Sequence, residues 1–328
     1  MESLVFALSA VVPIMAMVAL GYILKRIGIL PRELVKPLNK LSFKVTLPAM
    51  LFLNVYNIEN AADLDYGYIF YTVLFTFAIF LIAFPLVCVF TKKNEHRGAL
   101  VQAAFRSNYA LIGIPLAESL FGVSGVAVAT LLSAIIVPLY NVLAVIDLSI
   151  FNKNGQKANL RSVLLGVLKN PLNQSIFLGV VMLLGRGLFQ QCGIEIRLSD
   201  ITPLMKVLGY LRQMATPLAL IILGVQFEFS VISELRKEIV FGTLARTIVV
   251  PMLALGTALL LFKDAFTGAH FAAIVAAFAT PVAVSSVPMA QEMGSGSDLA
   301  GQLVVWTTLV SGFTVFLASF ILKSIGVF

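Results

Sequence analysis

The segment RSNYALIGIPLAESLFG, Arg106–Gly122, places an arginine, an asparagine, a proline and a glutamate within one of the most hydrophobic parts of the chain. A proline in a membrane-spanning helix removes a backbone hydrogen bond and clashes with the preceding turn. The freed backbone groups are tolerated only where they are buried in protein or line a water-filled cavity. The segment therefore predicts an interrupted helix that faces the interior of a helical bundle.

The composition is that of a membrane protein. Of the 328 residues, 59% are hydrophobic and 12% are charged, and the mean hydropathy is +0.99. A soluble domain usually carries about 25% charged residues. Apolar runs of about 20 residues, the length that crosses a bilayer as a helix, recur along the chain. They predict an all-α polytopic membrane protein with about ten spans, at residues 4–24, 38–57, 68–90, 98–121, 125–150, 172–190, 203–227, 239–262, 268–293 and 299–322.

The basic residues are unevenly distributed between the two sides of the predicted membrane. If the connection after the first span is cytoplasmic, fifteen of the 23 Lys and Arg residues fall on the cytoplasmic side and five on the opposite side. The remaining three, Arg106, Arg212 and Arg246, lie within spans. Short loops rich in Lys and Arg stay in the cytoplasm. We therefore expect a multi-pass protein of the inner or plasma membrane with both termini extracytoplasmic.

Five predicted spans precede a basic central loop and five follow it, so the second half is expected to lie upside down relative to the first. We expect a first five-helix repeat at residues 1–151, a cytoplasmic linker at 152–171 and a second, inverted repeat at 172–328. The stretch NYALIGIPLAESLFG, Asn108–Gly122, aligns with PVAVSSVPMAQEMGS, Pro281–Ser295, in the fourth span of each half. This 5+5 inverted repeat predicts that helices four and nine are both broken and cross each other.

Two broken helices that meet near the bilayer midplane present unpaired N–H groups and a partial positive charge, which suit a carboxylate. An intramembrane arginine is costly to bury and is therefore a functional candidate. The residues expected to bind the substrate are Asn108, Arg106, Tyr109, Gly113, Pro115, Pro281, Ser285, Ser286 and Pro288. The residues expected to bind a coupling ion or to line the cavity are Glu118, Glu292, Asn141 and Thr308.

Several of these side chains also have a purely structural interpretation. Arg106 and Arg246 could pair with a carboxylate or a carbonyl group inside the bundle, and Glu118 and Glu292 could be interfacial carboxylates. Polar residues in membrane bundles also hydrogen-bond across helices. Asp147, close to the cytoplasmic end of the fifth span, is expected at the membrane interface.

Three stretches resemble the auxin efflux carrier family, which includes the PIN-FORMED auxin exporters of plants and bacterial malate- and malonate-type permeases. NYALIGIPLAESLFG and ATPVAVSSVPMAQEMG resemble the family's broken fourth and ninth helices, and LKNPLNQSIFLG, Leu168–Gly179, resembles the motif that opens its second half. The resemblance implies a scaffold of spans one, two, six and seven and a transport part of spans three to five and eight to ten. It also implies that Asn108 contacts the substrate carboxylate. Pro281 occupies the matching position in the second half, so a symmetric pair of asparagines is absent.

We therefore expect a secondary active or facilitative transporter of small organic anions that works by alternating access. The expected substrates are mono- or dicarboxylates such as malate or malonate, or auxin-like acids. The alternative is a Na⁺- or H⁺-coupled symporter or antiporter of the bile-acid symporter or sodium/proton antiporter type.

Few partners are expected besides the substrate. They are the lipid bilayer and a second copy of the chain, bound through the scaffold helices, and not nucleic acid. No cofactor or metal is expected apart from Na⁺ or H⁺ as a coupling ion. The sequence contains no His-Glu-x-x-His motif, no Gly-x-Ser-x-Gly motif and no phosphate-binding glycine loop, so an enzyme is not expected.

Overall fold

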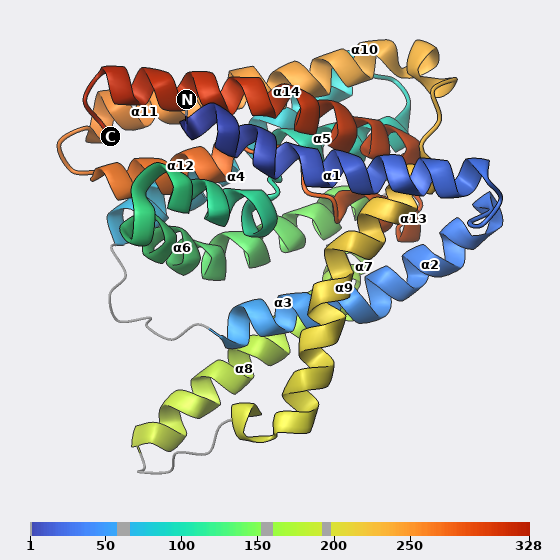
Figure 1. Cartoon of the computed structure of the whole chain (residues 1–328), viewed down its shortest axis with the longest axis horizontal. Helices are drawn as coiled ribbons and strands as arrows, with labels where there is room; N and C mark the ends of the chain where they lie inside the picture. Colours follow the sequence, from blue (N-terminus) through green and yellow to red (C-terminus); the bar gives the residue numbers. More distant parts are fainter. Residues whose placement is uncertain (1, 58–65, 152–159, 192–197) are drawn as a thin grey trace.

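Helices make up nearly all of the described chain. The computed structural model describes residues 2–57, 66–151, 160–191 and 198–328, which Figure 1 shows as a bundle of helices. Within these ranges the secondary structure is helical apart from one isolated β-bridge. The α-helices are α1 (Glu2–Arg26), α2 (Val35–Leu41), α3 (Leu47–Tyr56), α4 (Tyr66–Phe90), α5 (Asn94–Phe105), α6 (Ile114–Ile150), α7 (Leu160–Lys169), α8 (Pro171–Gln191), α9 (Thr202–Gln226), α10 (Val231–Leu244), α11 (Val250–Phe262), α12 (Gly268–Phe278), α13 (Ser286–Glu292) and α14 (Ser297–Ser324).

Short non-α turns connect several of these helices. The π-helical segments are η2 (Ser42–Thr46), η3 (Tyr109–Gly113) and η5 (Ala245–Val249), and the 3₁₀ turns are η1 (Arg32–Leu34) and η4 (Leu198–Asp200). A proline follows each π-helical segment within its next two residues. Proline has no backbone N–H and cannot donate the hydrogen bond that an α-helix needs at its position. A change from α to π geometry just before each proline accommodates this missing bond.

Five helical segments in the described part of the chain are long and apolar enough to cross a membrane. They are Tyr66–Phe90, Tyr109–Ile150, Thr202–Gln226, Val231–Phe262 and Ser297–Ser324. The prediction of an all-α, multi-pass membrane protein is thus confirmed, and the ten-span inverted repeat stays a prediction.

The long helix α6 contains a sharp bend at Gly122. Its φ of 59° and ψ of −146° lie in a region that glycine enters without steric cost. A Cβ atom on Gly125 would lie 2.1 Å from the Ala117 carbonyl oxygen, so the two parts of α6 pack closely across the bend. The bend separates a short segment that begins at Ile114 from the longer segment that ends at Ile150, close to the predicted boundary between the fourth and fifth spans.

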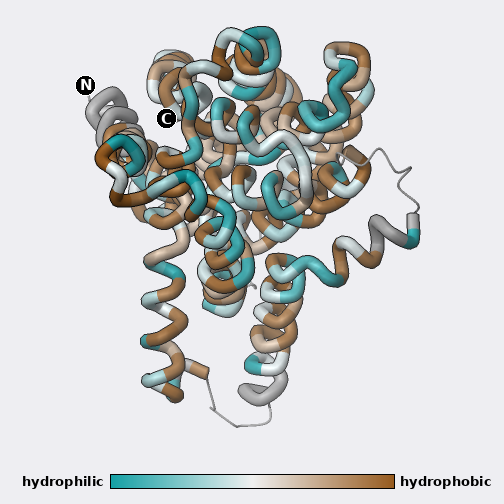
Figure 2. The backbone as a smooth tube through the Cα atoms, turned by 90° about the vertical axis from the view of Figure 1, so that its right-hand side faces the viewer, coloured by the Kyte–Doolittle hydropathy of each residue, from teal (hydrophilic) through white to brown (hydrophobic). Residues whose placement is uncertain are grey.

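The helices form two groups by their contacts. One, which we call the four-helix group, consists of α1, α3, α8 and α9, with α2 continuing through η2 into α3. The other, the large group, consists of α4–α6 and α10–α14, and α1 and α14 pack together where the two groups meet. Figures 1 and 2 show α8 and α9 projecting away from the large group. Within the four-helix group, α1 and α9 approach so closely that a Cβ atom on Gly224 would lie 2.0 Å from the Val18 carbonyl oxygen. Small residues permit such close approach between membrane helices.

Candidate functional site

Two helix interruptions lie directly against each other. One separates α5, which ends at Phe105, from η3, and the other separates α12, which ends at Phe278, from α13. Between them, Ser107 and Val282 form an antiparallel β-bridge. The Asn108 N–H donates to the Pro281 carbonyl over 2.8 Å, and the Ala283 N–H donates to the Arg106 carbonyl over 3.4 Å. We call this paired region, residues 106–108 and 281–283, the crossover.

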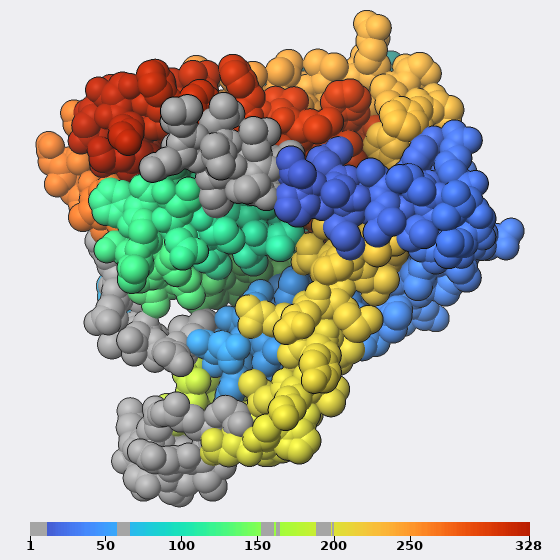
Figure 3. Space-filling view, viewed as in Figure 1, coloured from blue at the N-terminus to red at the C-terminus, as the bar shows by residue number. Residues whose placement is uncertain are grey.

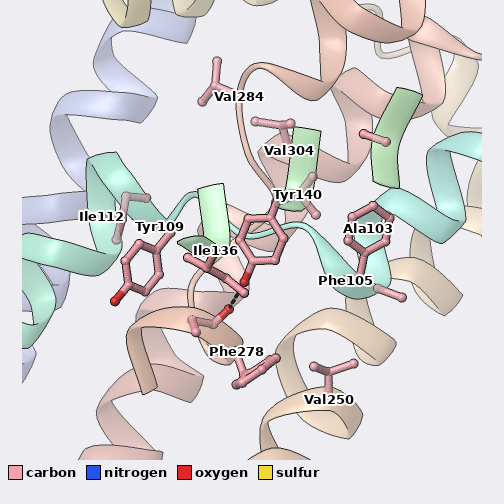
Figure 4. Close-up of a cluster of buried hydrophobic side chains, with 14 of the residues drawn as sticks. Ala103, Phe105, Tyr109, Ile112, Ile136, Tyr140, Val250, Phe278, Val284 and Val304 are labelled. Atoms are coloured by element: carbon pink, nitrogen blue, oxygen red, sulfur yellow. Dashed lines mark hydrogen bonds between the residues drawn. The ribbon is translucent and has the colours of Figure 1, made fainter. Parts of the chain in front are cut away.

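The hydrogen bonds of the crossover satisfy backbone groups that the two interruptions leave without helical partners. An extended segment at membrane depth has no helical partner for its backbone groups and no lipid group that can replace one. Here the two segments supply partners to each other, and the Val282 N–H donates to the Thr307 side-chain oxygen over 3.1 Å. Figure 4 shows the buried side chains around these segments, among them Phe105, Tyr140 and Phe278. The Tyr140 hydroxyl donates to the Ala277 carbonyl over 3.3 Å, which ties α6 to the end of α12.

The Arg106 side chain links the first interruption to the second through hydrogen bonds. Its side chain, in a residue that is 2% exposed, donates to Gln102 Oε1 over 3.0 Å, to Asn141 Oδ1 over 2.8 Å and to Ser285 Oγ over 2.9 Å. Its guanidinium also lies 2.9 Å from the Met289 sulfur. These partners are neutral and come from α5, α6, the second interruption and α13. Arg106 therefore links α5 and α6 to the second interruption.

Arg246 holds the ends of the two broken helices together. It is 0% exposed and lies in η5. Its guanidinium donates to the carbonyl oxygens of Thr280 over 2.8 Å, Ala277 over 3.0 Å and Ala104 over 3.2 Å. Ala104 is near the C-terminus of α5 and Ala277 is near that of α12, where backbone carbonyls lack helical partners and carry partial negative charge. One cation thus caps both helices beside the crossover.

A cavity of about 870 Å³ lies between the crossover and the four-helix group. Figure 3 shows the surface hollowed between α6, drawn in green, and the helices α3 and α9, drawn in blue and yellow. Most of the lining is apolar and comes from α1, α3, α9 and the two interruptions. The polar and charged lining residues are Asn54, Asn57, Asn108, Arg212, Gln213, Thr216 and Ser285.

Asn108 is prominent among the lining residues. It is 8% exposed, and its Nδ2 atom has no hydrogen-bond partner among the described residues. A buried amide donor without a partner costs free energy, so its presence on a cavity wall indicates a place for an acceptor. Asn108 also precedes η3, whose first backbone N–H groups have no preceding helical turn to bond with.

The other residues predicted to bind substrate fall into two sets. Pro115 and Ser285 line the cavity with Asn108, whereas Arg106, Tyr109, Gly113, Pro281, Ser286 and Pro288 are not among its lining residues. The Tyr109 hydroxyl donates to the Ala129 carbonyl over 3.0 Å within the large group. A Cβ atom on Gly113 would lie 3.0 Å from the Ala276 carbonyl oxygen, so this glycine lets η3 approach α12.

The four residues predicted to bind a coupling ion or to line the cavity lie elsewhere in the bundle. Asn141 accepts the hydrogen bond from Arg106, and Thr308 donates to the Val304 carbonyl over 2.6 Å. Glu118 is exposed and Glu292 is half-buried. None of these four lines the described cavity.

Asp147, which we expected at the membrane interface, lies near the end of α6 and is enclosed by protein. Asp147 is 0% exposed, and neither carboxyl oxygen has a hydrogen-bond partner among the described residues. The reason is a glycine on the neighbouring helix: a Cβ atom on Gly98 of α5 would lie 3.6 Å from Asp147 Oδ2. Without a side chain at that position, α5 packs closely over the end of α6.

The contribution of α9 and α3 to the cavity was not predicted from the sequence. Gly209, Arg212, Thr216 and Leu220 line it and recur every three or four residues, which places them on one face of α9. Arg212 and Thr216, two polar residues four positions apart on this face, were the available signal. Asn54 on α3 lines the same cavity.

An all-helical membrane protein with paired helix interruptions beside a cavity has the architecture of a transporter. The chain belongs to the membrane transport protein family, whose model matches residues 6–319. This match confirms the resemblance to the auxin efflux carriers. The chain is 24% identical over 320 residues to an uncharacterized transporter of Methanothermobacter thermautotrophicus, covering 92% of this chain and 93% of that protein. It is 28% identical over 124 residues to an uncharacterized transporter of Methanocaldococcus jannaschii, covering 37% of this chain and 40% of that protein.

Replacing Arg246 by lysine tests its capping role. A lysine ammonium cannot reproduce the planar fork that reaches three carbonyl groups. Loss of two hydrogen bonds to a charged group should cost about 3 kcal/mol. We expect the purified Arg246→Lys protein to have a lower midpoint of thermal unfolding than the wild type. Arg212→Lys is the matched control, because Arg212 has no hydrogen-bond partner in the described structure; equal midpoints for both variants would contradict the capping role.

Proposed function

We propose that the protein is a secondary active or facilitative transporter of small organic anions. In this proposal the substrates are mono- or dicarboxylates, and one carboxylate is bound at the crossover. The observation that carries the proposal is the unpartnered Asn108 amide on the wall of a cavity built from two interrupted helices. A carboxylate is an acceptor only, with two oxygens, and so complements donors that lack partners.

The backbone beside Asn108 favours the same kind of ligand. The helical segment that starts with η3 continues into α6, and its N-terminal end lies at the crossover. The first N–H groups of a helix point out of its N-terminus and carry partial positive charge. Ala110 and Leu111, in the first turn of this segment, line the cavity. Amide donors from the backbone and from Asn108 therefore lie on the same wall.

The cavity and the polar contacts between the helix groups lie toward opposite ends of the bundle, which fits alternating access. The cavity extends to Asn57, at the end of α3, and to Met205, near the start of α9. Toward the end of α9, Gln226 Nε2 donates to Asp298 Oδ1 of α14 over 3.3 Å. There too, the side chain of Asn39 in α2 hydrogen-bonds to that of Gln291 in α13. If the basic loops are cytoplasmic, the cavity extends outward and the contacts lie on the cytoplasmic side.

An ion-pair cluster lies at the same end as these contacts. Glu228, in the connection between α9 and α10, pairs with Lys25 over 3.1 Å and with Arg32 over 2.8 Å. The hydrogen bond from Lys25 and the nearby charge of Arg32 hold the pKa of Glu228 below its usual value. A carboxyl group with a lowered pKa stays ionised at neutral pH, and its pairs weaken only as the pH falls through that lowered pKa. The cluster is therefore in place under physiological conditions.

Uptake of a radiolabelled dicarboxylate into proteoliposomes tests the anion site. We expect Asn108→Ala to lower uptake at least tenfold, because the carboxylate loses a buried donor. Asn173→Ala is the matched control, since Asn173 lies on α8 and bonds to the Val167 carbonyl away from the cavity. Equal, saturable uptake by the Asn108→Ala protein and the wild type would remove Asn108 from the site.

Cross-linking tests alternating access. Cysteines replace Asn39 and Gln291 in a protein whose Cys88 and Cys192 are changed to serine. A short, reducible bifunctional thiol reagent should link α2 to α13, keep this end closed and abolish uptake, because the two helix groups can no longer separate there. Reduction should restore uptake, and the single-cysteine variants treated in the same way should remain active. Full uptake by the cross-linked protein would contradict the mechanism.

A further inference from the structure

Arg212 is a cation whose role the crossover does not explain. It lies on α9 and lines the cavity. No other described lining residue is charged. Its guanidinium has no hydrogen bond and no ion pair to any other described residue. The other two arginines that the sequence places within spans donate to protein acceptors, Arg106 to side chains and Arg246 to backbone carbonyls.

The surroundings of Arg212 leave its donors available to a ligand. Gly209, one turn earlier on the same face of α9, has no side chain to cover it, and nothing lies within 4 Å of where its Cβ atom would be. Asn54 and Asn57, on the neighbouring helix α3, add amide groups to the same cavity. An arginine within a membrane span is expensive unless it faces water or a partner of opposite charge. No described acidic residue lines this cavity, so the protein itself supplies no such partner there.

Arg212 and the crossover are on different walls of one cavity. Thr216, which also lines it, follows Arg212 by four residues, a distance of about 6 Å along a helix axis. Asn108 and Ser285 line the cavity from the two interruptions, which belong to the large group, whereas Arg212 belongs to the four-helix group. A ligand that contacts both walls needs an acceptor group at each of two ends.

We propose that Arg212 binds a second negative group of the substrate and thereby selects dicarboxylates over monocarboxylates. This inference rests on the proposed function, in which the first carboxylate is bound at Asn108. A guanidinium group offers two parallel N–H donors that match the two oxygens of a carboxylate. A monocarboxylate with an apolar tail would displace water from Arg212 without replacing its hydrogen bonds, which disfavours binding. Dianion binding also joins the two helix groups through the substrate.

The test compares two substrates in proteoliposomes that contain the full chain. Uptake of labelled malonate and of labelled acetate is measured for the wild type, Arg212→Gln, Arg212→Lys and Arg236→Gln. Arg236 lies on α10, is exposed and does not line the cavity, so its variant controls for the loss of one positive charge. We expect Arg212→Gln to raise the KM for malonate by about 10- to 100-fold and to leave the KM for acetate nearly unchanged. Arg212→Lys should lie between the wild type and Arg212→Gln, and Arg236→Gln should behave as the wild type.

If the Arg212→Gln protein takes up acetate, the variant is folded. The second readout is thermal unfolding: malonate should raise the unfolding midpoint of the wild type but not that of Arg212→Gln. An equal change in KM for both substrates, or no change for either, would overturn the role of Arg212 while leaving the proposed function standing. If the wild type shows neither uptake of nor a thermal shift with any carboxylate, both proposals fall together.

Discussion

The structure depends on the hydrogen bonds that two interrupted helices make to each other at the depth of the membrane. Breaking a helix there exposes backbone groups that lipid cannot satisfy. The Ser107–Val282 bridge and the bond from the Asn108 N–H to the Pro281 carbonyl supply partners from within the protein. Because the backbone groups of each interruption are hydrogen-bonded to the other, neither segment can move far without the other. The crossover can therefore act as a rigid wall and present Asn108 to the cavity.

The three arginines within the predicted spans illustrate how the same side chain takes different roles in one bundle. Arg246 caps the carbonyl ends of α5 and α12, and Arg106 links α5 and α6 to the second interruption. Both side chains are buried, and their N–H groups donate hydrogen bonds to neutral acceptors. Arg212 is exposed to the cavity. Two of the three cations thus hold helices together within the protein, and the third lines the cavity without a hydrogen-bond partner among the described residues. Burial and hydrogen-bond partners, more than charge, distinguish these roles.

Proline and polar residues in apolar runs allowed the two interruptions to be located from the sequence, because their effect on a helix is local. The α9 face with Arg212 and Thr216 was missed, since its role depends on which helices face the cavity, and that is decided by tertiary packing. The burial of Asp147 was not predicted for the same reason: it follows from the glycine at position 98 on another helix. The sequence left Arg106 with two interpretations, and its hydrogen bonds to Asn141 and Ser285 could not be predicted because both partners lie on other elements of the fold.

The central claim is that the crossover forms the wall of an anion site, and locating a bound carboxylate tests it most directly. Crystals of the full chain grown with a brominated dicarboxylate would give the position of the ligand from the anomalous scattering of bromine. The account predicts a bromine peak inside the cavity, with a carboxylate within hydrogen-bond distance of Asn108 Nδ2. A ligand bound with full occupancy elsewhere, and an empty cavity beside Asn108, would contradict it.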